Sequence, residues 1–327
     1  MKRNARAGAI RNAGLSFSVF SEADIDDIHL ATLEVLERTG VFVEQDEAFD
    51  LFADGGCRVG REGRVVRIPA HVVEDAIRST PPKVVLCSRD PRNDVVLEAG
   101  RVAFTNFSEG IKVIDPYTGE LRDSVKDDVA AIARLNDYLS EMDTFELAVG
   151  AKDVPEETAS LHNVEAALLN TTKCVAGQAL SEWESEAMID MAAALVGGRD
   201  ALRDRPILYL GVCPVSPLQL PREVTEVVIS SARAGIMDLV LSMAMAGGSS
   251  PVTLAGTMVT HNAEVLAGIT LAQLAERGAP CVYGSSTTGL DLRFAAACVG
   301  SPELSLISAA VAQMAQRYKI PSFVAGL

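Results

Sequence analysis

The sequence predicts an α/β protein, a TIM-type (β/α)8 barrel that is incomplete in this chain and follows an N-terminal α+β region. From about residue 125, predicted helices and strands alternate strictly, which is typical of a parallel sheet. Several strands are almost continuous apolar runs, such as 207–212, as expected where both faces of a sheet are covered. This part contains six predicted strands, whereas a closed barrel needs eight. We therefore expect that the N-terminal region supplies two strands or that the chain is incomplete.

Composition narrows the class of protein. The chain has 327 residues, with 29 Lys+Arg against 44 Asp+Glu, a net charge of −15 and 48% hydrophobic residues. Such a composition is typical of a globular protein, and the excess of acid argues against a nucleic-acid surface. No apolar run is long enough for a membrane span, and the start lacks the apolar block of a secretory signal. Six scattered cysteines without a C-x-x-C pattern indicate neither disulfides nor a metal site, and predict a cytoplasmic location.

The N-terminal part divides into a basic tail, residues 1–20, and the α+β region, residues 21–122. Ser21 followed by Asp24 predicts a helix start, and Gly40 ends that helix. Further helices are expected at 47–53 and 69–79, and a hairpin at 57–68. Short strands are predicted at 84–87, 95–97, 102–105 and 112–114, followed by a turn at 115–119.

Residues 123–327 form the predicted partial barrel. Its helices are expected at 125–140, 155–170, 183–196, 221–234, 252–276 and 302–318. Its strands are expected at 145–149, 174–178, 207–212, 239–243, 281–285 and 322–325. No G-x-G-x-x-G follows the first strand, so a dinucleotide-binding fold lacks its best signature.

Functional residues of parallel α/β folds lie at the carboxyl ends of strands and in the loops that follow. Here those loops are 213–217, 244–251, 284–291 and 325–327, and they are small and rich in Gly, Ser and Thr. They suit either a close approach to a ligand or plain tight turns. Cys213 at a strand exit is either a nucleophile or a small buried residue. Asn262, on the long helix 252–276, either projects inward or has a packing or capping role.

Aromatic residues make up only 5% of the chain, so their positions are informative. Phe104 and Phe107 lie close to Glu109, and Tyr209 and Tyr283 lie in predicted strands. Aromatic rings together with a carboxylate bind a methylated ammonium ion through cation–π attraction and charge. The alternative is that these rings are ordinary core residues.

Several stretches taken together, in their order along the chain, resemble the trimethylamine:corrinoid methyltransferase (MttB-like) family. The resemblance runs from about residue 21 to the end. It rests on Ile28–Gly40, Asn170–Lys173, Gly211–Leu218, Met245–Gly256 with Asn262–Glu264, and Val282–Ser285.

The resemblance implies a (β/α)8 barrel that moves a methyl group from an amine to the Co(I) corrinoid of a partner protein. Family members continue well beyond this length, and the founding trimethylamine enzymes carry pyrrolysine in this part of the chain. We therefore expect an in-frame UAG codon, and pyrrolysine, directly after Leu327. The imine of pyrrolysine would accept the amine and make it quaternary.

The expected partners are a cognate corrinoid protein and a small amine, in a homo-oligomer, without nucleic acid or membrane. No cofactor is expected to be bound directly, and no catalytic residue is placed within 1–327. The substrate-binding residues predicted from position are Phe104, Phe107, Glu109, Tyr209, Tyr283 and Asp291. Two alternatives remain open: a relative without pyrrolysine that demethylates quaternary amines such as glycine betaine, and an inactive truncated barrel that only binds.

Overall fold

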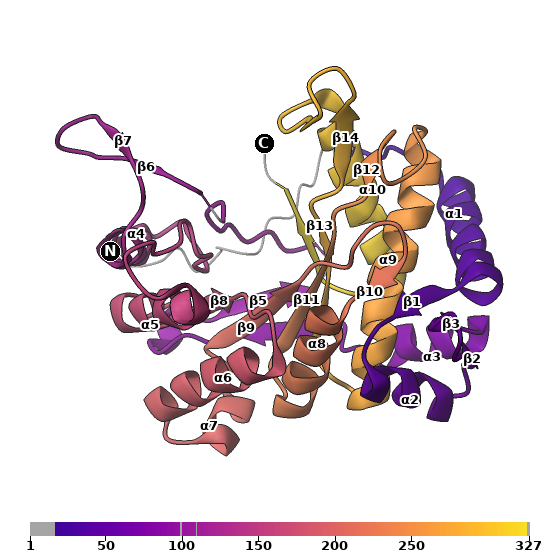
Figure 1. Ribbon diagram of the computed structural model, residues 1–327, viewed down its shortest axis with the longest axis horizontal. Helices are drawn as coiled ribbons and strands as arrows, with labels where there is room; N and C mark the ends of the chain where they lie inside the picture. The colour runs from indigo at the N-terminus through magenta and orange to yellow at the C-terminus, as the bar shows by residue number, and fades with distance from the viewer. Residues whose placement is uncertain (1–16, 99, 109, 326–327) are drawn as a thin grey trace.

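A parallel sheet of five strands forms the centre of the molecule, in the order β16-β13-β11-β9-β8 (Figure 1). The computed structural model describes residues 17–325 except 99 and 109, so most of the predicted basic tail lies outside the described residues. The strands are β8 Val175–Gly177, β9 Leu208–Val212, β11 Met237–Ser242, β13 Cys281–Ser285 and β16 Ser322–Val324.

Helices cover one face of this sheet, which we call the outer face (Figure 1). They are α5 Ala159–Asn170, α6 Glu182–Val196, α8 Arg222–Ala234, α9 Leu254–Ala275 and α10 Pro302–Tyr318, with the short α7 Arg199–Asp204 beside α6. The alternation of helices and parallel strands predicted from the sequence is confirmed. Among the described residues, no helix combines the length and the apolar character that a membrane crossing requires.

Five of the six strands predicted for the barrel form this sheet. The remaining one, 145–149, is the first in chain order and joins the sheet only through isolated bridges. Phe145 pairs in parallel with Val175, and Val149 pairs with Gly110. Residues 104–108 and Gly110 therefore run alongside this segment, and the main-chain NH of Asp143 donates to the carbonyl of Phe104 over 2.7 Å. The predicted strand 102–105 is wrong, because this segment forms single hydrogen bonds at the edge instead of a ladder. The described residues thus build an open sheet, to which the N-terminal region adds one extended segment.

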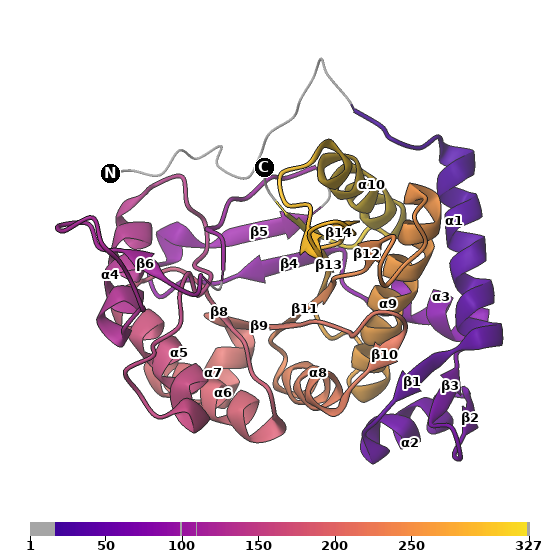
Figure 2. The ribbon, with the colours of Figure 1, turned by 45° about the horizontal axis from the view of Figure 1, so that its top comes forward.

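The N-terminal helices pack against the long helix α9 (Figure 2). The elements of this region are α1 Glu22–Glu34, the π-helical turn Val35–Thr39, β1 Val41–Val43, α2 Asp46–Asp54, β2 Arg58–Gly60, β3 Val65–Arg67 and α3 Ala70–Ser79. β1 also pairs in parallel with β10, Gln219–Leu220. The predicted helices 47–53 and 69–79 and the hairpin 57–68 are confirmed.

Three hairpins and one helix complete the described chain. β4 Lys83–Leu86 and β5 Val95–Glu98 form an antiparallel hairpin, and β6 Val113–Ile114 and β7 Leu121–Arg122 form a second one that projects from the body (Figure 1). β14 Thr288–Asp291 and β15 Ala296–Ala297 form the third, and β14 also pairs with β12 Met245–Ala246. α4 Lys126–Tyr138 packs on α5, and 3-10 turns lie at Pro91–Asn93 and Glu156–Thr158.

Two apolar clusters hold the sheet, one on each face. Leu208 and Leu210 belong to the cluster under the outer helices. Tyr209, between them, belongs to a second cluster with Val84 and Val95 of the β4–β5 hairpin. This alternation defines an inner face of the sheet. The β4–β5 hairpin packs against this face around Tyr209.

The predicted start of the first helix is a capping box. The Ser21 Oγ accepts from the Asp24 NH over 3.2 Å, and the Asp24 carboxylate accepts from the Ser21 NH over 2.9 Å. We expect Ser21→Ala to lower the free energy of unfolding by about 1 kcal/mol, because a helix NH loses its acceptor. Urea denaturation measures this loss. Ser21→Asp, which retains an acceptor, is the control, and equal losses for both variants would contradict the prediction.

Asp238 is a fully buried carboxyl group on the outer face, and its Oδ1 accepts from the Ser231 hydroxyl over 2.5 Å. Burial raises the pKa of Asp238 well above 3.8, so the native state binds a proton that the unfolded state has released. Stability therefore falls by about 1.4 kcal/mol per pH unit above pH 4, until the native pKa is passed. We expect Asp238→Asn, which resembles the protonated acid, to lack this slope in denaturation measured across pH. The exposed Asp204→Asn should keep it, and a wild-type slope in Asp238→Asn would contradict this account.

Candidate functional site

The inner face of the sheet carries an acid and a phenol in direct contact. The Tyr209 hydroxyl donates a hydrogen bond to Oε1 of Glu146. Tyr209 is 2% exposed and Glu146 5% exposed. Burial, then the neighbouring Glu146 charge, raises the pKa of Tyr209 well above 10, so the phenol stays protonated and donates. The two residues stand 63 positions apart in the sequence. They meet because the segment 145–149 pairs with β8 and β8 pairs with β9.

Asn106 fixes the main chain of Glu146 on its other side. Its Nδ2 donates to the Glu146 carbonyl over 2.8 Å, and its Oδ1 accepts from the Glu146 NH over 3.1 Å. The Asn136 amide also donates to Asn106 Oδ1, over 3.1 Å. Asn106 thereby clamps the segment 145–149, which has no strand ladder on this side. This clamp holds the backbone of Glu146 in place.

The layer above the Tyr209–Glu146 pair is made of half-buried residues. The inner-face residues Glu146, Ala176, Tyr209 and Leu239 are each followed, two positions later on the same face, by a partly exposed residue. These residues are Ala148, Gln178, Gly211 and Leu241. A Cβ on Gly211 would meet a Leu239 methyl at 3.9 Å, which is ordinary van der Waals contact, so a small side chain would fit at this position. The inner face therefore reaches solvent at the carboxyl ends of the strands, with Tyr209 and Glu146 directly below.

The loops above this layer are fixed to α9 by one carboxylate. Glu264 accepts from the Ser216 hydroxyl over 2.8 Å, from the Leu218 NH over 3.0 Å and from the Ser242 hydroxyl over 2.6 Å. Because Ser216 and Leu218 follow β9 and Ser242 ends β11, one side chain positions the ends of two neighbouring strands. Burial raises the pKa of Glu264, and the three donors oppose this shift.

The two phenylalanines predicted to bind substrate lie at the surface. Phe104 is 57% exposed and Phe107 81% exposed, both on the segment beside 145–149. Glu109 lies outside the described residues. The structure thus brings the segment that carries Phe104 and Phe107 next to Glu146, but it leaves the two rings in solvent.

Tyr283 does not face the inner side of the sheet. Its hydroxyl donates to Oδ1 of Asn262 on α9 over 2.7 Å, and its ring lies 5.9 Å from that of Tyr318 on α10. Asn262 in turn donates to the hydroxyls of Thr32 and Tyr318 over 2.9 and 2.8 Å. Of the two alternatives for Asn262, the structure supports packing, because this buried network joins α1, α9, α10 and β13.

The remaining predicted positions stabilise turns or lie at strand exits. Asp291 accepts at Oδ1 from the main-chain NH groups of Arg293 and Phe294, over 2.8 and 3.2 Å, in the β14–β15 turn. In the loop 244–251, the NH groups of Gly247 and Gly248 donate to main-chain carbonyls within their own turn, as in a plain tight turn. Cys213 is exposed. The alternative of a small buried residue is therefore wrong for Cys213.

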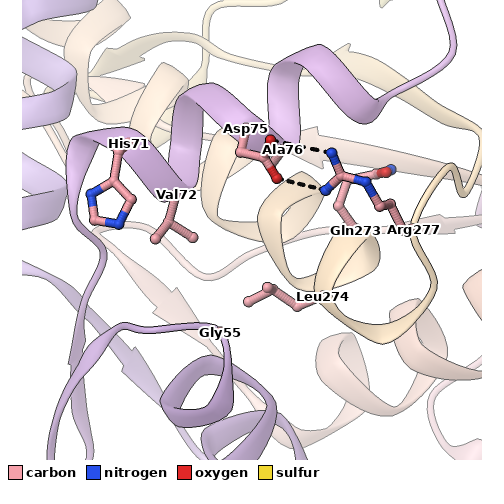
Figure 3. A pocket seen from close by; sticks show the side chains of 8 residues that line it. All are labelled: Gly55, His71, Val72, Asp75, Ala76, Gln273, Leu274 and Arg277. Atoms are coloured by element: carbon pink, nitrogen blue, oxygen red, sulfur yellow. Dashed lines mark hydrogen bonds and ion pairs between the residues drawn. The ribbon is translucent and has the colours of Figure 1, made fainter.

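A separate cleft of about 200 Å³ lies between α3 and α9 (Figure 3). Its lining consists of Gly55, His71, Val72, Asp75, Ala76, Gln273, Leu274 and Arg277. An ion pair of 2.6 Å joins Asp75 to Arg277 beside it. Arg277 precedes β13, so this cleft lies toward the amino ends of the strands, away from Tyr209 and the loops described above. Within residues 17–325, leaving out 99 and 109, no cluster of three or more His, Cys, Asp or Glu could hold a metal ion.

Sequence reasoning did not single out Glu146. No motif marks it, since it stands alone among apolar residues in 145–149. The one available signal was its position: a carboxylate in the middle of a predicted buried strand requires a partner. Such a signal names neither the partner nor the face of the sheet.

The sequence of this chain is similar to a family of known proteins. The family model for trimethylamine methyltransferase (MTTB) matches residues 2–327. A trimethylamine methyltransferase of Desulfitobacterium hafniense is 47% identical over 321 residues, covering 98% of this chain and 65% of its own. A glycine betaine methyltransferase from another strain of that species is 31% identical over 310 residues, covering 94% and 64%. The chain thus spans about two thirds of the length of these relatives.

The fold has a counterpart among solved structures. The monomethylamine methyltransferase (MtmB) of Methanosarcina barkeri superposes with a TM-score of 0.52 at 14% identity, covering 92% of this chain and 67% of that one. At this identity the likeness concerns the fold alone. The match of the family model over almost every residue decides the assignment: the chain belongs to the trimethylamine methyltransferase (MTTB) family.

Proposed function

We propose that this protein, as part of a longer polypeptide, transfers a methyl group from trimethylamine to the Co(I) corrinoid of a partner protein in the cytoplasm. The observation that carries the proposal is the 47% identity to a trimethylamine methyltransferase over 98% of the chain. The 31% identity to a glycine betaine methyltransferase is lower, which favours trimethylamine over betaine as the methyl donor.

The described part of the protein suits a small methylated amine. Its parallel sheet is proposed to form most of a (β/α)8 barrel, in which substrates bind at the carboxyl ends of the strands. Those ends carry small loops, a half-buried layer and the Tyr209–Glu146 pair below it. The corrinoid supplies the acceptor for the methyl group. The chain's own residues would bind and orient the amine and exclude water.

We further propose that pyrrolysine follows Leu327. β16 runs parallel to β13, so the carboxyl end of β16 lies at the same edge of the sheet as the loops that follow β9 and β11. Mass spectrometry of peptides from the native cells, across the position after Leu327, tests this proposal. A peptide that contains pyrrolysine after Leu327 is expected, and an ordinary residue at that position would overturn it.

Methyl transfer is tested with the protein purified from its native cells and its corrinoid partner. We expect trimethylamine to convert Co(I) corrinoid to the methylated form, followed by its visible absorbance. Glycine betaine at the same concentration should give no conversion above background. Conversion with betaine but not with trimethylamine would overturn the proposed substrate.

A homo-oligomer is also proposed, on the basis of the projecting β6–β7 hairpin. Its apolar side chains Ile114, Tyr117 and Leu121 are 70%, 96% and 65% exposed. Such a group of apolar side chains on a projecting hairpin is typical of a contact with another chain. Light scattering coupled to gel filtration measures the mass of the native assembly, and a monomer would overturn the proposal.

A further inference from the structure

We propose that the carboxylate of Glu146, held by the Tyr209 hydroxyl, is the charged group of this chain that binds the methylated ammonium substrate. The inference rests on the proposed function, since it names the residue that would recognise the amine. It replaces the sequence-based assignment of this role to Glu109 or Asp291.

Position is the first argument. Glu146 lies on the inner face of the sheet. The next residues toward the carboxyl ends, Ala148 on the same segment and Gln178 and Gly211 on neighbouring ones, are partly exposed. A ligand that enters from the carboxyl ends of the strands reaches Glu146 after passing one layer of small or flexible side chains. Gly211, two positions after Tyr209 on the same face, carries no side chain, and an added Cβ would only touch a Leu239 methyl at 3.9 Å.

Chemistry is the second argument. A fully methylated ammonium has no NH group, so a protein recognises it by charge and by the faces of aromatic rings. Glu146 supplies a carboxyl group, and Tyr209, whose hydroxyl donates to it, supplies an aromatic ring on the same face of the sheet.

Rigidity is the third argument. Asn106 holds both the NH and the carbonyl of Glu146, and Tyr209 holds its side chain. A carboxylate fixed at both ends loses little conformational freedom when the ligand binds. By contrast, Asp291 is engaged by two NH groups of its own turn.

The test measures binding of tetramethylammonium, a permanent cation, and of tert-butanol, a neutral molecule of similar shape, to the native full-length protein by calorimetry. Glu146→Gln removes the charge but keeps an oxygen that accepts from Tyr209. We expect it to weaken tetramethylammonium binding at least about tenfold, while tert-butanol binding changes less than about twofold. Glu157→Gln, an exposed residue with the same change of charge, should leave both affinities unchanged.

The results separate this inference from the proposed function. Equal affinity of wild type and Glu146→Gln for tetramethylammonium, or no binding by wild type, would overturn the role of Glu146, whether or not methyl transfer occurs. Binding that depends on Glu146, without methyl transfer from trimethylamine, would overturn the proposed function and leave the site intact. Should Glu146→Gln fail to fold, NMR of the wild-type complex tests the inference instead. We expect contacts between the methyl protons of tetramethylammonium and the labelled Tyr209 ring, whose signal is assigned with Tyr209→Phe. Their absence in a saturated wild-type complex would overturn the inference.

Discussion

Asn262→Ala is expected to lower the free energy of unfolding by about 3–5 kcal/mol. The Asn262 side chain is fully buried and accepts from the Tyr283 hydroxyl while donating to the hydroxyls of Thr32 and Tyr318. Alanine leaves three buried hydroxyl groups without this partner and opens a space in the core. The loss is large because α1, α9, α10 and β13 all meet at this amide.

Denaturant unfolding of the native protein measures this loss, with Asn170→Ala at the end of α5 as the control. Asn170 is half-buried and donates to the Ala166 carbonyl, so its replacement should cost less than about 1 kcal/mol. Tyr283→Phe removes one of the hydroxyls that Asn262 serves. The double variant should therefore lose less than the sum of the two single variants. Additive losses would contradict the network.

Glu264→Ala is expected to cost about 3 kcal/mol of stability, because the Leu218 NH and the hydroxyls of Ser216 and Ser242 lose one common acceptor. It should also loosen the loop 213–218 and the end of β11, which this carboxylate joins to α9. Glu264→Gln retains one acceptor oxygen, so it should lose about half as much.

Two measurements check this prediction. Denaturant unfolding gives the loss of stability, with the exposed Glu276→Ala of the same region as the control, expected within about 0.5 kcal/mol of wild type. Hydrogen exchange of the Leu218 amide reports the loop directly and should become faster in Glu264→Ala. An unchanged exchange rate would show that the carboxylate does not hold this loop.

Much of the secondary structure follows from local signals in the sequence. The capping box at Ser21, Gly40 at the end of the first helical segment and the turn at 115–119 are features of a few neighbouring residues, and they appear where predicted. The apolar strands and the alternation with helices follow from periodicity, which is also local. The segment 102–105 was wrongly predicted as a strand, and its hydrogen-bond partner lies some 40 residues away, at the edge of the sheet.

The site depends on information that local sequence lacks. Tyr209 and Tyr283 both stand in buried strands with apolar neighbours, yet Tyr209 faces inward beside Glu146 and Tyr283 faces outward onto Asn262. Where both faces of a strand are apolar, no alternation of polar residues reveals which side a given position takes, and a shift of one residue exchanges the two faces. The sequence by itself determined the class of fold, the helix ends and the family. Only the tertiary structure decided which aromatic ring meets a carboxylate, because strand register and the packing of the outer helices select the face.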